Sequence, residues 1–289
     1  MLHGFLNIDK PAGMTSHDVV AHIRRAAQQK RVGHAGTLDP AATGVLVVAI
    51  GNATRLIEYV QDSTSKRYLA TVQLGVITTT DDAEGAVLAT AAVPPLDRAA
   101  LEQALESFRG EILQVPPMYS ALHHQGRRLH ELAREGIVVE RAARPVTIER
   151  LELLDWDASC LTLDIMCSKG TYIRSLARDL GATLGCGAHL QALRRTAVGG
   201  FVIEHATPLA LIKNVDTIMS TLAPPELAVA DWPVVVLDAE AERRVRNGLA
   251  IERTGGAERA RAHGPEGDLL ALLVRAGDLW RPEKVFDWS

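Results

Sequence analysis

One segment of the sequence places an imidazole and a carboxylate among glycines. It runs from Gly33 to Gly44, reads GHAGTLDPAATG, and contains His34 and Asp39. Glycine permits close approaches and unusual backbone angles, and Pro40 restricts the preceding Asp39 to an extended conformation. We therefore expect a turn that exposes Asp39 as a nucleophile or a general base. The alternative is an aspartate that bonds to its own turn, beside a histidine at the surface.

Basic residues concentrate between residues 168 and 195. This stretch carries five lysines and arginines against one acid, a local charge of +4, whereas the whole chain has a formal charge of -4. Within it, Lys169, Tyr172 and Arg174 fall near the junction of a predicted strand and a predicted helix. One basic face on an acidic protein would suit a nucleic acid, although an ordinary solvated surface also carries such runs of charge.

Short apolar runs and helical periodicities alternate along the chain, which predicts an α+β or mixed α/β fold. Val45–Ile50, a continuous apolar run just after the glycine-rich segment, is typical of a buried strand. Ser16 is positioned to cap a helix that extends to about Gln28. The other predicted elements are strands at 4–9, 68–74, 161–165 and 234–237, and helices at 97–110 and 172–184.

Length and composition allow one large domain and a smaller companion. With 289 residues, of which 47% are hydrophobic, the chain can bury a core without disulfides. A Pro-Pro pair leads into a polar segment that we interpret as an insertion, at about residues 117–146. A second proline pair precedes the strand near residue 234. We therefore predict a catalytic domain at 1–232 and a small domain at 233–289.

Several familiar functional classes lack their sequence signatures. The three cysteines show no CxxC spacing, so we expect neither a disulfide framework nor a zinc cluster, and a reducing cytoplasm fits best. The chain has no Walker loop, HExxH pair or GxSxG turn, and the glycines at 185 and 187 lack the third glycine of a dinucleotide site. No apolar run reaches the length of a membrane span. We predict a cytoplasmic protein.

Six segments, in order along the chain, resemble the motifs of one enzyme family, that of tRNA pseudouridine synthase B. The first begins at residue 9 and the last ends at residue 196, and an ordered set of this kind is far more specific than one glycine-rich loop. The segments are Asp9–Ser16 (DKPAGMTS), Gly33–Gly44, Lys66–Tyr68 (KRY), Pro116–Ala121 (PPMYSA), Cys167–Arg174 (CSKGTYIR) and Leu193–Thr196 (LRRT).

The resemblance implies a fold, a reaction and a partner. The family fold is α+β, with a mixed, mainly antiparallel β-sheet core, flanking helices and an RNA-binding insertion, followed by a small C-terminal PUA-like domain. Its members convert the uridine at position 55, in the T loop of tRNA, to pseudouridine. The resemblance therefore implies a monomeric enzyme that binds the T stem-loop of tRNA and uses neither cofactor nor metal.

The resemblance also assigns roles to single residues. Asp39 matches the catalytic aspartate, which adds to the uridine or removes a ribose proton while the bond from C1′ to N1 breaks; the base then rotates and rejoins C1′ through C5. Arg174 matches the arginine that pairs with this carboxylate, and we expect it to favour the ionised form. Its replacement by alanine should then reduce turnover more than stability. Lys10 and Lys66 are expected to support the loop or to contact phosphate.

Four further residues match positions that contact the substrate. Tyr68 corresponds to the tyrosine that packs against the target base, and His34 to the residue that helps to hold or replace the extruded nucleotide. Tyr172 and Leu193 match positions that line the uridine pocket. Without the family, each of the four would be assigned to packing or to the surface.

The chain departs from the family pattern at His123, His130 and Thr79, where lysine, tyrosine and aspartate are usual. We expect a weaker grip on RNA at the two histidines, and the placement of the acids around Thr79 stays open. Two other functions are compatible with the residues. One is a non-catalytic RNA-binding or tRNA-folding module, a role that can also accompany catalysis. The other is a base-removing hydrolase in which Asp39 activates water and free uracil is released.

Overall fold

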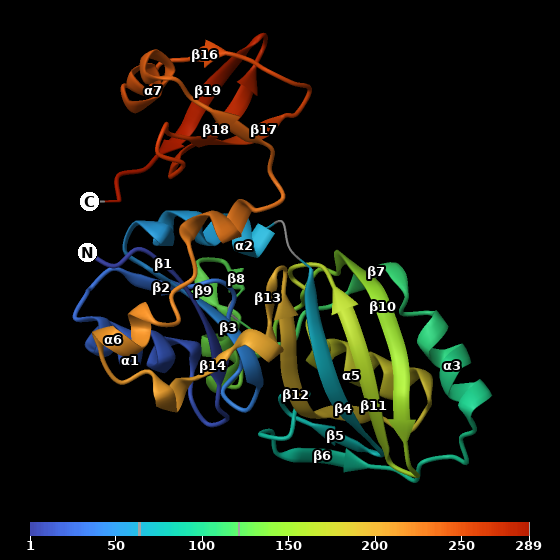
Figure 1. Ribbon diagram of the computed structural model, residues 1–289. Helices are drawn as coiled ribbons and strands as arrows, with labels where there is room; N and C mark the ends of the chain where they lie inside the picture. Colours follow the sequence, from blue (N-terminus) through green and yellow to red (C-terminus); the bar gives the residue numbers. More distant parts are fainter. Residues whose placement is uncertain (63–64, 121, 289) are drawn as a thin grey trace.

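The computed structural model describes residues 1–62, 65–120 and 122–288, except for the side chains of His124 and His130. Two β-sheets dominate this part of the chain (Figure 1). The larger contains β1 (Gly4–Lys10), β2 (Val32–His34), β3 (Thr43–Ile50), β4 (Lys66–Leu74), β7 (Gly110–Gln114), β10 (Arg144–Trp156), β11 (Cys160–Cys167), β12 (Ala188–Val198), β13 (Phe201–Val202) and β14 (Thr207–Pro208). The smaller contains β15 (Val234–Val236), β16 (Ile251–Glu252), β17 (Arg259–His263), β18 (Leu269–Ala276) and β19 (Leu279–Val285).

Helices flank the sheets, and two short hairpins accompany them. The hairpins pair β5 (Val76–Thr78) with β6 (Val87–Thr90), and β8 (His123–His124) with β9 (Arg127–Arg128). The α-helices are α1 (Ser16–Ala27), α2 (Ile57–Asp62), α3 (Arg98–Glu106), α4 (Leu129–Arg134), α5 (Ile173–Thr183), α6 (Val215–Met219) and α7 (Ala239–Arg246). Short 3-10 helices are η1 (Gly51–Leu56), η2 (Ile203–His205), η3 (Leu209–Leu211) and η4 (Pro225–Val229).

Most neighbouring strands are antiparallel. The larger sheet runs β14-β1-β3-β12-β4-β11-β10-β7, and among its described residues the parallel pairs are β1 with β14 and β3 with β12. Strand β12 meets β3 through two residue pairs but pairs with β4 along most of its length. The sheet therefore has two halves joined at β12, and α5 lies on one face of the second half (Figure 1). The predicted α+β class with a mixed, mainly antiparallel sheet is confirmed.

The continuous apolar run after the glycine-rich segment is β3, as predicted. Its alternate side chains enter different cores. Leu46 and Val48 pack in the core that contains the apolar face of α1. Val45 and Val47 pack in a second core, which also contains Phe286 from the C-terminal end of the chain. A strand buried on both faces needs apolar residues at successive positions, which explains why the run does not alternate.

The start of α1 corrects one prediction. Thr15, rather than Ser16, caps the helix: its hydroxyl accepts the N–H of Asp18, and the carboxylate of Asp18 accepts the N–H of Thr15. Ser16 is buried, and its hydroxyl bonds to the backbone of Leu38. Two adjacent hydroxyl residues are equivalent candidates for a cap in the sequence, and only the long-range contact separates them. The first turn of α1 is thus tied to the glycine-rich loop.

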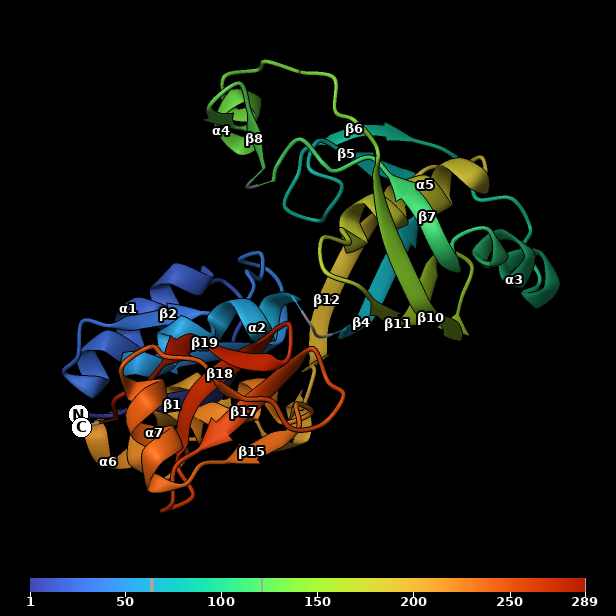
Figure 2. The same ribbon diagram turned by 90° about the horizontal axis from the view of Figure 1, so that it is seen from above.

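Two parts of the chain stand beside the large sheet. The segment with β8, β9 and α4 projects away from the sheet (Figure 2). The small sheet lies next to α2 (Figure 1), where the ring of Tyr59 meets that of Trp232 edge to face at 5.3 Å. Lys284 donates there to the carbonyl of Arg55. The second core continues across this contact, so the small sheet is packed onto the rest of the chain rather than tethered to it.

Candidate active site

The loop between β2 and β3 carries Asp39 and is held on both sides of it. The buried hydroxyl of Ser16 accepts the N–H of Leu38 at 2.9 Å and donates to its carbonyl at 3.1 Å. The fully buried ammonium of Lys10 donates to the carbonyl of Pro40 at 3.0 Å. Both neighbours of Asp39 are therefore fixed through backbone atoms, which supports the prediction that Lys10 serves the loop architecture.

A buried arginine holds the beginning of the same loop. Arg195 on β12 is 1% exposed, and its guanidinium donates to the carbonyls of Gly36 at 3.0 Å and Val45 at 2.7 Å. The backbone of β12 also approaches Gly44 so closely that a Cβ there would lie 2.2 Å from the carbonyl oxygen of Arg195. Gly44 has φ of +97°, so glycine is required by both backbone angle and space. The loop thus sits at the joint between the two halves of the sheet.

Asp39 is paired with Arg174, which comes from the other half of the sheet. Nε of Arg174 lies 3.0 Å from one carboxylate oxygen, and Nη2 lies 3.4 Å from the other. The Arg174 side chain is 7% exposed and also donates to the carbonyls of Thr80 and Tyr119, whereas the Asp39 side chain is 42% exposed. The interpretation of Asp39 as an aspartate that bonds to its own turn is therefore wrong, and the pairing that the resemblance implied for these residues is present.

The environment makes Asp39 a stronger base than an ordinary aspartate. Loss of surrounding water raises the pKa of its carboxyl, Arg174 opposes this rise, and the carboxylate of Asp82 adds to it. Asp82 itself lies 3.6 Å from Nη1 of Arg174. The expectation that Arg174 favours the ionised form is right in sign, but desolvation is the larger effect. The arginine keeps a basic carboxylate oriented.

Two of the predicted pocket residues surround this pair. Tyr68 on β4 is 7% exposed, and burial raises the pKa of its phenol, while the negative charge of Asp39 adds to the rise. Tyr172, at the N-cap of α5, also has a phenol pKa raised first by burial and further by Asp39. Both of its backbone polar groups bond to the Gln114 side chain, at 2.8 and 3.1 Å. Two rings are therefore within electrostatic range of the carboxylate.

Leu193 and His34 border the same region. Leu193 is half-buried on β12 and pairs with Ala70, two residues along β4 from Tyr68, so all three side chains share one face of the sheet. His34 ends β2, and its ring meets that of His17 edge to face at 5.4 Å. Burial lowers the pKa of the His34 imidazole, and its Nδ1 is sealed without a partner.

The cations of the stretch 168–195 each contact an acceptor of the protein. Lys169 and Arg194 make their ion pairs at the surface, whereas Arg174 and Arg195 are buried, and acids from other parts of the sequence offset the local charge of +4. The contacts are Lys169 with Asp62 (3.0 Å), Arg174 with Asp39 (3.0 Å), Arg178 with Asp81 (3.1 Å), Arg194 with Asp9 (2.9 Å), and Arg195 with backbone carbonyls.

The sequence analysis missed Ser16, Arg195 and Asp82 as parts of this site. Arg195 belongs to the LRRT motif, but the sequence analysis gave it no role. Asp82 lies just after Thr79, where the chain departs from the family pattern and the placement of the acids was left open. The structure places the neighbouring Asp81 against Arg178 and Asp82 near Arg174. Of the two histidine departures, His123 is exposed on β8. The side chain of His130 lies outside the described part of the structure.

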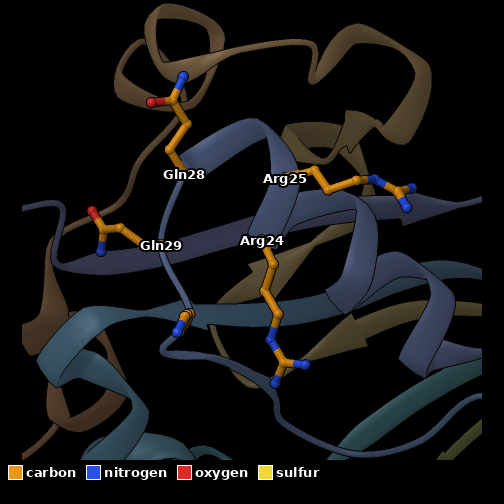
Figure 3. Close-up of a pocket in the computed structure, with 5 residues that line it drawn as sticks. Arg24, Arg25, Gln28 and Gln29 are labelled. Carbon is orange, nitrogen blue, oxygen red and sulfur yellow. The ribbon is translucent and has the colours of Figure 1, made fainter.

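A separate depression lies at the C-terminal end of α1. It has a volume of about 430 Å³ and is lined by Arg24, Arg25, Gln28, Gln29 and Lys30. The labelled side chains point in different directions, so they do not converge on one ligand position (Figure 3). Among the described residues, no cluster of three or more His, Cys, Asp or Glu side chains suits a metal. The described helices are also too short or too polar to cross a membrane.

Comparison with protein families identifies the chain. A model of the TruB family pseudouridylate synthase N-terminal domain matches residues 24–173. A model of the tRNA pseudouridylate synthase B C-terminal domain matches 174–228, and one of the tRNA pseudouridine synthase II C-terminal region matches 232–287. The tRNA pseudouridine synthase B of Thermobifida fusca is 45% identical over the full length of both chains. That of Gloeobacter violaceus is 52% identical over 73% of each chain.

Solved structures agree with the sequence comparison. A chain of a Cbf5-Nop10-Gar1 complex superposes with a TM-score of 0.75 at 28% identity, over 98% of this chain and 85% of the other. An H/ACA RNP bound to a substrate RNA containing 2′-deoxyuridine gives 0.74 at 26% identity, over the same shares. The chain belongs to the TruB family of pseudouridylate synthases and is an RNA uridine isomerase.

Proposed function

We propose that the chain isomerises uridine to pseudouridine at position 55, in the T loop of tRNA, with Asp39 as the catalytic group. The observation that carries this proposal is the pairing of a partly exposed carboxylate with the buried guanidinium of Arg174 at 3.0 Å. The loop that presents Asp39 is fixed through its backbone, so the carboxylate itself is free to react. Preorganisation of this kind lowers the cost of reaching the reactive geometry.

The reaction needs no co-reactant, because substrate and product are isomers. The glycosidic bond from C1′ to N1 breaks, the uracil rotates, and C1′ bonds to C5. The proton on C5 is lost and N1 gains one, so atoms and electrons balance. Asp39 serves either by adding to the uridine or by removing a ribose proton, and its raised pKa favours proton uptake in the second route. In both routes, the detached base must stay in the pocket.

Retention of the base is the role we propose for the aromatic and apolar residues. Extruding a nucleotide costs a few kcal/mol, and stacking on an aromatic ring returns about 1 to 3 kcal/mol. In this proposal Tyr68 stacks on the base and assists proton loss from C5, while Tyr172 and Leu193 line the pocket. His34, at the end of β2, helps to hold or replace the extruded nucleotide.

The tRNA partner follows from the relatives, which are named tRNA pseudouridine synthase B. We propose a catalytic domain at 1–232, an RNA-gripping insertion at about 117–146, and a small RNA-binding domain at 233–289, in a monomeric cytoplasmic protein. The projecting position of β8, β9 and α4 supports the second assignment. The family models divide the chain near the same place, because the last one begins at residue 232.

Incubation with unmodified tRNA, followed by chemical mapping of pseudouridine, tests the proposal. We expect one modified position, in the T loop, with no change in RNA mass. Free uracil in the supernatant would instead identify a hydrolase. Tight tRNA binding without product, across several tRNAs, would identify a non-catalytic binding or folding module. Mapping a tRNA whose T-loop uridine is replaced by cytidine is the matched control.

A further inference from the structure

Two cations lie side by side against the loop between β2 and β3, which carries Asp39. Lys66, the first residue of β4, is 9% exposed, and Arg195 on β12 is 1% exposed. A methyl group built on Gly36 would lie 3.6 Å from Cε of Lys66 and 3.7 Å from Nη1 of Arg195. Both side chains therefore reach the same point under the loop, between His34 and Asp39 in the sequence.

Among the residues that the structure describes, no carboxylate forms an ion pair with Lys66 or Arg195. The guanidinium of Arg195 donates to the carbonyls of Gly36, Thr37 and Val45. The ammonium of Lys66 makes no hydrogen bond or ion pair with the described residues. Lys10, which is equally buried, shows the contrast: its ammonium donates to three backbone carbonyls. Lys66 is thus nine-tenths buried and unpartnered.

The neighbouring acidic groups do not neutralise the pair. Burial raises the pKa of the Cys167 thiol to about 11, so the sulfur next to Lys66 is uncharged at neutral pH. The pKa of the Tyr68 phenol is raised as well, by burial. The charge of the Asp62 carboxylate also acts on Lys66, but Asp62 is paired with Lys169 at 3.0 Å. Within the described part of the chain, no carboxylate is therefore paired with either of the two cations.

A buried cation without a partner destabilises a fold, and burial accordingly lowers the pKa of Lys66. A site of this kind is complementary to an anion that arrives from outside. We propose that Lys66, supported by the field of Arg195, binds a phosphodiester oxygen of the RNA strand that enters the active site. This inference rests on the proposed function, because the RNA supplies the anion. Because Lys66 lies under residues 34–39, which carry Asp39 and His34, the phosphate belongs to the extruded nucleotide or to its immediate neighbour.

Lys66→Met tests the proposal, because it removes the charge and keeps most of the apolar stem. A residue that only supported the fold would lose stability on substitution. A phosphate-binding residue gives the opposite result: the melting temperature rises, because an unpaired buried charge is gone, while tRNA affinity falls about tenfold or more. The logarithmic dependence of tRNA affinity on salt should become shallower by about 0.7, the value for one phosphate on a single strand.

Lys169→Met is the matched control, since its ammonium is exposed and paired with Asp62. It should leave the melting temperature, the affinity and the salt dependence close to native. An unchanged salt dependence in Lys66→Met would overturn the proposal, whatever happens to stability. If the native enzyme binds tRNA but forms no pseudouridine, the proposed function is refuted, while the comparison of tRNA binding between Lys66→Met and the native protein still tests the phosphate contact. The two proposals can therefore fail separately.

Discussion

Asp39→Asn separates a chemical role of this carboxylate from a structural one. The change keeps the shape of the side chain and removes its charge. The loop should not move, because Ser16 and Lys10 hold the backbone of its neighbours. Arg174 keeps its bonds to the carbonyls of Thr80 and Tyr119. We therefore expect tRNA binding close to native and a loss of turnover of about 1000-fold or more, as for the removal of a general base or nucleophile.

The stability of this variant follows from the pKa. The folded state raises the pKa of Asp39, so the folded state holds the proton more tightly than the unfolded chain. The stabilisation from this proton is fully present below the unfolded pKa and is lost as pH rises through the folded value. At neutral pH, removing the negative charge of Asp39 therefore relieves a small desolvation cost. Losing the ion pair with Arg174 lowers the free energy of unfolding by about 0 to 1 kcal/mol. The free energy of unfolding should stay within about 1 kcal/mol of native.

Single-turnover assays at saturating tRNA, with urea unfolding of the same samples, measure both quantities. Glu106→Gln is the control, because this exposed carboxylate on α3 also pairs with a cation, Arg109, but lies outside the site. Turnover within tenfold of native would refute Asp39 as the catalytic group. A loss of stability above about 3 kcal/mol, with proportionate loss of binding, would instead identify a structural residue whose removal disturbs the buried network.

Other substitutions test the surroundings of the carboxylate. Arg174→Ala should reduce turnover and also lower the free energy of unfolding by about 3 kcal/mol, a larger stability loss than the sequence led us to expect, because two carboxylates lose their buried cation; urea unfolding measures it. The acid limb of the kcat/KM profile should lie above the ordinary range of aspartate, and Asp82→Asn should shift it to lower pH because a like charge is removed. Ser16→Ala should reduce kcat more than it changes KM, since it frees Leu38 next to Asp39; equal effects on both would contradict this.

Local patterns were enough to predict the elements that deliver the site. The apolar run of β3, the alternation of β4 and the periodicity of α5 each reflect contacts within a few residues, so they are readable from the sequence. The resemblance then selected Asp39 and Arg174, which are 135 positions apart. No periodicity links residues so distant, because their contact depends on how the two halves of the sheet meet at β12.

The error at the helix cap has the same origin. Ser16 was taken for a helix cap because its long-range partner, Leu38, is invisible to local reasoning. The partners of the cations between 168 and 195 were equally hidden, because their acids lie elsewhere in the sequence, such as Asp9 and Asp62. In each case a polar side chain found a partner made available only by the tertiary fold, which overrides local preference when the group is buried.

The hydrogen bonds around Asp39 explain how one loop can be rigid and reactive together. The contacts that Ser16, Lys10 and Arg195 make with the loop all end on its backbone atoms, and none uses the carboxylate. Arg174 touches the carboxylate but is itself anchored by backbone carbonyls of other segments. Protonation of Asp39, or a covalent bond from it to the substrate, therefore changes one ion pair and leaves the scaffold intact. A loop held through the carboxylate would have to come apart in every catalytic cycle.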